Sequence, residues 1–219
     1  MRDVTLTFDN GPEPDVTPGV LDVLARTEVL ASFFVLGKKI ADPARRKRAE
    51  RAAAEGHWIA NHTYSHETPL GNLPGRDVPE AEIGRTQALI GDLAHPDRLF
   101  RPFGGGGALG PHLLGRPVAD YLIEGRYTCV LWNVIPRDWA DPDGWVETAM
   151  DLIAPLDHAL IVVHDLPTGA MAHLERFIDR VRDAGGTFRQ DFPGDCVPLR
   201  RGRVTGDFDA CVTETAGAA

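Results

Sequence analysis

The sequence predicts an α/β fold in which roughly seven strand–helix units form a closed or nearly closed, distorted barrel. Short apolar runs rich in β-branched and aromatic residues alternate with helix-like segments, which is typical of a parallel sheet with helical crossovers. All the units fit in one domain of 219 residues, with a core over about residues 4–190 and an irregular tail over 191–219. A hydrophobic content of 43% suits a globular protein with one full core.

The apolar runs set the expected strands, each bounded by Gly, Pro or Asp as buried strands often are. These runs are residues 4–8, 31–36, 58–61, 98–101, 127–132 and 160–164, with a weaker one at 187–189. The expected helices between them are residues 17–27, 43–55, 79–94, 111–121, 144–153 and 170–184. Thr17 and Pro18 are typical of a helix start, and Gly185 followed by Gly186 is typical of a helix end.

The composition argues against several classes of binding partner and binding site. A net charge of −9 and a pI of about 5.3 argue against nucleic acid and against an anionic membrane surface. The basic cluster at residues 45–51 lacks aromatic side chains, so we interpret it as the solvated face of a helix. Three cysteines without a CxxC pair exclude a thiol-rich metal site. Because no leader precedes the first strand and no apolar run has membrane-spanning length, we expect a cytoplasmic protein.

Two histidines one helical turn apart, His62 and His66, indicate a metal site. Neutral imidazoles are the commonest metal ligands, and the i, i+4 spacing lets one ion reach both rings. Two histidines can have this spacing in an ordinary polar first turn of a helix. The evidence for a metal site therefore depends also on the neighbouring segments. A strand that ends in Asp9 precedes the pair, and an apolar strand that ends in His164 follows it. Together the three segments favour a hydrolytic metal site.

The other polar candidates also follow the ends of expected strands. Asp9 and Asn10 follow the first strand, Arg101 the fourth, Asp138 the fifth and His164 the sixth. In a barrel of parallel strands these ends meet at one rim, and that rim carries the chemistry of such folds. The candidates should therefore converge on a single site.

Five short motifs in this order resemble those of the polysaccharide deacetylase family, the NodB-homology domains of carbohydrate esterase family four. They are Thr7–Pro12 (TFDNGP), His62–His66 (HTYSH), Phe100–Gly104 (FRPFG), Trp132–Trp139 and Leu160–His164. The resemblance covers about residues 4–190 and implies the NodB-homology fold, a distorted (β/α)7 TIM-like barrel. It also implies a divalent metal, most often zinc with cobalt or nickel as options. The implied reaction is hydrolysis of an N-acetyl or similar amide, a carbon–nitrogen bond other than a peptide bond.

Carried over by position, the resemblance implies acid–base residues and metal ligands. The acid–base residues would be Asp9 as general base, oriented by Arg101, and His164 as general acid, oriented by Asp138. The metal ligands would be Asn10, His62 and His66. Each residue also has an ordinary structural interpretation. Asp9 and Asn10 could form only the turn before Gly11, Arg101 could belong to a surface ion pair, and His164 could be a satisfied buried histidine.

The loop after the fourth strand is the expected substrate-binding segment. A backbone N–H near Phe103 could help to hold an oxyanion, and Gly104 begins four glycines that suit close approach of backbone to a ligand. Trp139 could form a wall of the groove. A floppy loop and ordinary core packing of the neighbouring tryptophans are the alternatives.

Three departures from the family pattern bear on function. Asn10 replaces the second Asp of the first motif, the third motif is one residue short, and Ile135 stands where many members have an earlier Asp. We therefore expect weaker metal binding and a small N-acylated compound or carbohydrate as substrate, not a cell-wall polymer. The alternative function is a catalytically weak or inactive barrel that binds carbohydrate or regulates another process. The complete acid–base set argues against it, because a binding module needs none.

Overall fold

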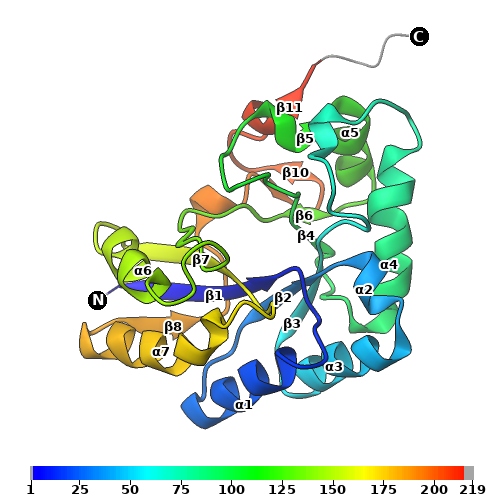
Figure 1. The fold of residues 1–219 in the computed structure, drawn as a ribbon. Helices are drawn as coiled ribbons and strands as arrows, with labels where there is room; N and C mark the ends of the chain where they lie inside the picture. The colour runs from blue at the N-terminus through cyan, green and yellow to red at the C-terminus, as the bar shows by residue number, and fades with distance from the viewer. Residues whose placement is uncertain (1, 215–219) are drawn as a thin grey trace.

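A strongly curled, mostly parallel sheet forms the centre of the computed structural model, which describes residues 2–214 (Figure 1). Across the sheet the strands are β10 (Arg203–Val204), β9 (Leu199–Arg200), β6 (Thr128–Cys129), β4 (Leu99–Phe100), β3 (Trp58–Asn61), β2 (Ser32–Val35), β1 (Asp3–Asp9) and β7 (His158–His164). The six strands from β6 to β7 pair in parallel, whereas β9 is antiparallel to both β6 and β10. β8 (Thr187–Arg189) pairs with the first half of β1, and β2 pairs with the second half.

The segment that follows β6 closes the ring of strands. Val134 forms an isolated parallel bridge with Ile161 of β7. Its amide donates to the Leu160 carbonyl at 3.1 Å, and its carbonyl accepts from the Val162 amide at 3.0 Å. The same stretch of chain pairs first with β4, through β6, and then with β7, through Val134. This closes the sheet into a distorted barrel, as the sequence predicts.

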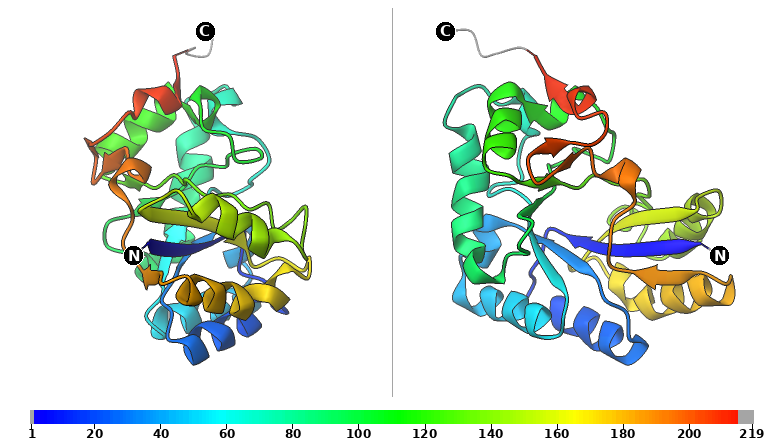
Figure 2. Two further views of the ribbon diagram at one scale, coloured as in Figure 1. Left: turned by 90° about the vertical axis from the view of Figure 1, so that its left-hand side faces the viewer. Right: turned by 180° about the vertical axis from the view of Figure 1, so that it is seen from behind.

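Alternation along the strands separates the helix-covered face from the barrel interior. On β1, Val4, Leu6 and Phe8 belong to a core with the helices α1 (Thr17–Thr27), α3 (Pro43–Ala54), α6 (Trp145–Ile153) and α7 (Leu174–Asp183). Successive side chains of a strand point to opposite faces, so Thr5, Thr7 and Asp9 point inward. Figure 2 shows α1, α3 and α7 together on one side of the sheet. The inward register of β1 carries Asp9 to the rim of the barrel.

Three expected helices differ from the structure. The one expected at 170–184 begins with the 3₁₀ turn η5 (Ala170–His173) and continues as α7. Residues 79–94 form a π-helix labelled η2 (Glu80–Gly84), then α4 (Arg85–Ile90) and the 3₁₀ turn η3 (Gly91–Leu93). The helix expected at 111–121 is instead the 3₁₀ turn η4 (Pro111–Leu113), the strand β5 (Leu114–Gly115) and the helix α5 (Arg116–Glu124). Pro117 explains the shift, because a proline inside a helix removes a hydrogen bond and clashes with the carbonyl four residues earlier. Here it lies in the first turn of α5, where it is tolerated.

The tail expected to be irregular contains regular elements in its described part. It forms η6 (Gly194–Cys196), β9, β10, η7 (Asp209–Cys211) and β11 (Val212–Thr213), and β11 pairs with β5 in parallel. Phe192, Val197 and Phe208 are buried in a second core with residues of β4, β6 and α5. Residues 215–219 of the expected tail lie outside the described part. The remaining short elements are α2 (Gly37–Ile40) and η1 (Leu70–Asn72).

Within residues 2–214, no helix combines the length and the apolar character needed to cross a lipid bilayer.

Candidate active site

A cavity of about 330 Å³ opens at the carboxyl ends of β1, β3 and β7. Eight of the ten site residues expected from the sequence line it, namely Asp9, Asn10, His62, His66, Phe103, Gly104, Trp139 and His164. The other two, Arg101 and Asp138, are completely buried and bind to residues that line the cavity. The structure therefore brings together all ten residues.

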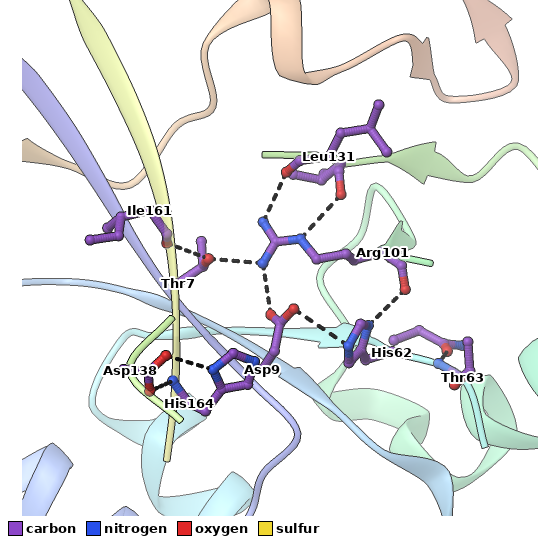
Figure 3. Close-up of polar contacts among 11 residues, drawn as sticks. Thr7, Asp9, His62, Thr63, Arg101, Leu131, Asp138, Ile161 and His164 are labelled. Atoms are coloured by element: carbon purple, nitrogen blue, oxygen red, sulfur yellow. Dashed lines mark hydrogen bonds and ion pairs between the residues drawn. The ribbon is translucent and has the colours of Figure 1, made fainter. Parts of the chain in front are cut away.

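Arg101 holds Asp9 in a fixed position (Figure 3). Its Nη1 donates to Asp9 Oδ1 at 2.7 Å and to Thr7 Oγ1 at 2.8 Å. Nε donates to the Val130 carbonyl at 3.2 Å and Nη2 to the Leu131 carbonyl at 3.1 Å. With 0% exposure, Arg101 is not part of a surface ion pair. A guanidinium engaged on each of its nitrogens is a rigid support for a carboxylate.

Thr7 is a site residue to which the sequence analysis gave no role. Its hydroxyl accepts from Arg101 and donates to the Ile161 carbonyl at 2.7 Å, which links β1, β7 and the guanidinium. The sequence contains a pattern that indicates this role, because Thr7 and Asp9 are two residues apart on one strand and share a face.

The Asp9 carboxylate is the charged centre of the site. Burial alone would raise its pKa, but the Arg101 guanidinium, followed by His62 and His164, outweighs burial and lowers the pKa. Asp9 is therefore ionised at neutral pH. Its second oxygen, Oδ2, lies 3.4 Å from His62 Nε2.

The two histidines of the expected metal site are neutral and adjacent. His62 Nδ1 lies 2.8 Å from the Arg101 carbonyl, and since a carbonyl only accepts, Nδ1 carries the proton and Nε2 is a free acceptor. The His62 and His66 rings have centroids 4.8 Å apart. Burial lowers the pKa of His62. Burial, and then His62, lowers the pKa of His66 to about 3. Both imidazoles can thus offer a lone pair at neutral pH.

Asn10 supplies an oxygen to the same cavity. It has a left-handed backbone (φ 73°) at the end of β1, a conformation that asparagine tolerates better than most residues. Its Oδ1 is buried and has no hydrogen-bond partner within residues 2–214. A buried amide oxygen without a donor is costly unless a ligand completes it. Beside two neutral imidazoles, this oxygen fits a divalent cation.

The described residues contain no group of three or more His, Cys, Asp or Glu side chains placed to hold a metal ion. Any third protein ligand beside His62 and His66 would be of another residue type, such as Asn10.

His164 lies beside Asp9, its register partner on the neighbouring strand, and is held by Asp138. Its Nδ1 lies 2.8 Å from Asp138 Oδ1, and its amide donates to Asp138 Oδ2 at 2.9 Å. Burial alone would lower the pKa of His164, but the hydrogen bond and charge of Asp138, together with Asp9, outweigh it and raise the pKa. Trp139 packs edge-on against the His164 ring, with centroids 4.9 Å apart. Asp138 thus favours the protonated form of His164, which can act as a proton donor in the cavity.

The glycine-rich loop forms one wall of the cavity. A Cβ on Gly104 would lie 2.6 Å from the Trp132 ring, so only glycine allows this approach. Gly105, Gly106 and Gly107 all have positive φ, and the Gly107 carbonyl accepts from Trp132 Nε1 at 2.8 Å. Ile135, one of the departures from the family pattern, also contacts the loop and lines the cavity. Trp132, Ile135, Phe103 and Trp139 give this side of the site an apolar surface.

Comparison with known proteins identifies the family. The family model for polysaccharide deacetylase matches residues 1–108. A chitooligosaccharide deacetylase of Rhizobium leguminosarum bv. trifolii is 37% identical over 166 residues, which cover 75% of this chain and 72% of the relative. The chain belongs to the polysaccharide deacetylase family. Its alignments span 66–72% of the lengths of the rhizobial chitooligosaccharide deacetylases that it resembles.

Solved structures of this family share the fold. A T48 deacetylase with substrate is 31% identical, with a TM-score of 0.70 over 86% of this chain and 87% of that chain. A family 4 acetyl xylan esterase from Clostridium thermocellum, in complex with a cobalt ion, is 26% identical. Its TM-score is 0.68 over 86% of this chain and 87% of that chain. The family and the barrel expected from the motifs are confirmed, and one of these solved relatives holds a divalent metal ion.

Proposed function

We propose that this polysaccharide deacetylase family member is a metal-dependent hydrolase that removes an N-acetyl or similar acyl group from a sugar or another small amide. One observation carries the proposal above all. Asp9 and His164 line the same cavity, and their surroundings move the two pKa values apart, lowering one and raising the other. Paired groups shifted in this way typically mark the base and the acid of an active site.

Asn10, His62 and His66 would hold the metal ion. Two imidazoles and one oxygen form a typical set for zinc, with cobalt or nickel as options, and such a set leaves positions open to substrate. When bound, the ion would act as a Lewis acid toward the amide carbonyl and increase the acidity of water.

The chain's own residues account for the proton transfers. Asp9, fixed by Arg101 and ionised, would take a proton from the attacking water. His164, whose protonated form Asp138 favours, would give a proton to the departing nitrogen. The backbone N–H near Phe103 would donate to the oxygen that gains negative charge, while Gly104 and Trp139 shape the wall around the acyl group.

A binding or regulatory protein is the competing function, and the acid–base set argues against it. Arg101 and Asp138 are completely buried and hold Asp9 and His164 in place. A sugar-binding surface needs no such set.

The proposed activity can be tested by following acetate release from N-acetylated chitooligosaccharides and small N-acyl compounds, with zinc, cobalt or nickel added. We expect metal-dependent release from at least one compound and its loss in the Asp9→Asn variant. Saturable sugar binding without hydrolysis under every metal condition would favour the competing function.

Substrate size is a further prediction. The cavity of about 330 Å³ is at the small end of ligand sites, and Ile135 and the glycine loop make one side of it apolar. We therefore expect a higher kcat/KM for short N-acyl compounds than for chitin or peptidoglycan chains. Much faster deacetylation of the polymers, compared at equal concentrations of N-acetyl groups, would contradict this expectation.

Substitution of Asn10 by aspartate should tighten metal binding. A neutral amide oxygen lacks the full charge that offsets dehydration of a divalent cation. We expect Asn10→Asp to lower the Kd for zinc by about tenfold or more, equivalent to about 1.4 kcal/mol, in calorimetric titrations. Asn72→Asp is the matched control, because Asn72 is exposed and outside the cavity. Equal affinity of wild type and Asn10→Asp would show that Asn10 is not a ligand.

A further inference from the structure

The turn that carries the two histidines has an unusual backbone. Thr63 and His66 both have positive φ, at 67° and 53°. For a β-branched residue such as Thr63 this conformation is a genuine outlier, and it persists only where the surroundings enforce it. The directions of the His62 and His66 rings depend on this turn, so the contacts that enforce it matter for the site.

Glu82, in the π-helix η2, is the charged side chain that binds the backbone of this turn, while the Arg85 guanidinium lies over the Tyr64 ring, 3.6 Å from its centroid. Its Oε2 accepts from the Tyr64 amide at 3.0 Å and from the Ser65 amide at 2.9 Å. Two successive N–H groups thus converge on one carboxylate oxygen, an arrangement in which charge strengthens both hydrogen bonds. Glu82 belongs to none of the five family motifs quoted from the sequence.

The helix is itself tied to the strand that leads into the turn. Asn61, the last residue of β3, donates from Nδ2 to the Ile83 carbonyl at 3.0 Å and accepts at Oδ1 from the Thr63 amide at 3.1 Å. The Thr86 hydroxyl donates to the Glu82 carbonyl at 3.0 Å. Isolated π turns inside α-helices are frequent at functional sites. Here the π turn places Glu82 beside the histidine turn.

The other supports of the turn come mainly from backbone. The Gly37 amide donates to the Thr63 carbonyl at 2.9 Å, and the Lys38 amide donates to the Tyr64 carbonyl at 3.2 Å. These bonds fix the carbonyl side of the turn, whereas Glu82 fixes the amide side at Tyr64 and Ser65. Removing the Glu82 carboxylate would therefore free the segment between the two histidines while the carbonyl side stays bound.

We propose that Glu82 is a positioning residue for the metal site: it holds the His62–His66 turn so that both rings face one cation before the cation binds. The inference rests on the proposed metal ligands but not on any particular substrate. Groups that orient metal ligands from outside typically contribute 10- to 100-fold to affinity. Glu82 differs from the usual examples in acting on the backbone between the ligands and not on an imidazole N–H.

The test is a cobalt and zinc titration of Glu82→Ala, Glu82→Gln and Glu80→Ala, with thermal unfolding of each metal-free protein. Glu80 is the matched control, since it is on the same π turn but accepts from the Tyr121 hydroxyl at 3.1 Å. We expect the Kd to rise by about 10- to 100-fold in Glu82→Ala, and Glu80→Ala to bind like wild type. Glu82→Gln keeps an acceptor oxygen without the charge, so it should recover part of the affinity. The absorption spectrum of bound cobalt should change in Glu82→Ala, because the geometry around the ion is altered.

The outcomes separate this inference from the proposed function. Equal cobalt affinity in wild type and Glu82→Ala would overturn the role of Glu82 while leaving the metal site intact. Wild-type protein that binds no divalent cation would overturn the metal site and this role together. If Glu82→Ala does not fold, the Glu82→Gln titration decides, and wild-type affinity with an unchanged cobalt spectrum in that variant would then contradict the proposal.

Discussion

Replacement of His62 by alanine is expected to abolish divalent metal binding and hydrolysis while the barrel stays folded. The variant removes one of the two imidazoles that line the cavity, and a site with one histidine and one amide oxygen has too few ligands to hold the ion. The barrel core does not include His62, although the Arg101 carbonyl loses its donor, at a cost of about 1–3 kcal/mol. Elemental analysis and calorimetry measure the binding, and thermal unfolding checks the fold.

The matched control for this experiment is His173→Ala, since His173 lies outside the cavity and pairs with the exposed Asp143. It should keep wild-type metal content and activity. Full metal occupancy in His62→Ala would exclude His62 as a ligand. A loss of metal in both variants would indicate damage that is not specific to the site.

The parts of the fold that follow from residue patterns were predictable. The helix expected at 17–27 and the strand expected at 58–61 have those boundaries in the structure, because their start, end and apolar spacing are all local signals. The fifth strand is shorter than expected, since only Thr128 and Cys129 pair regularly with β4 and the chain then crosses to β7. Closure of the barrel, which ends that pairing, is a tertiary effect that no local pattern contains.

The part of the site that lies at the ends of strands was predictable from the sequence. Asp9, Arg101 and His164 lie together because each follows a parallel strand of one barrel, and parallel strands end on the same side. What the sequence could not provide was the contacts between distant segments. Glu82 binds the histidine turn only because η2 packs beside β3, and the glycine loop lies against the Trp132 ring, which comes from a distant segment.

Replacement of His164 by alanine should lower turnover by about 10²- to 10⁴-fold, the usual loss when acid–base assistance is removed. Metal content should not change, because His164 contacts Asp138 and Trp139 and is not one of the proposed ligands. Single-turnover measurements at saturating metal separate this effect from weaker metal binding. Near-wild-type turnover would show that His164 is only structural.

The pH profile gives an independent test of the same role. The general acid must be protonated, and the pKa of His164 is raised above its usual value of 6.5, so kcat/KM should fall as pH rises through that raised pKa. The general base must be ionised, and since the pKa of Asp9 is lowered, the acidic fall should lie below pH 3.8 unless the protein unfolds first. In His164→Ala the basic fall attributed to His164 should vanish. In Asp138→Asn it should move to lower pH, because the charge that raises the His164 pKa is gone. A basic limb that stays unchanged in both variants would assign it to another group and remove His164 from the role of general acid.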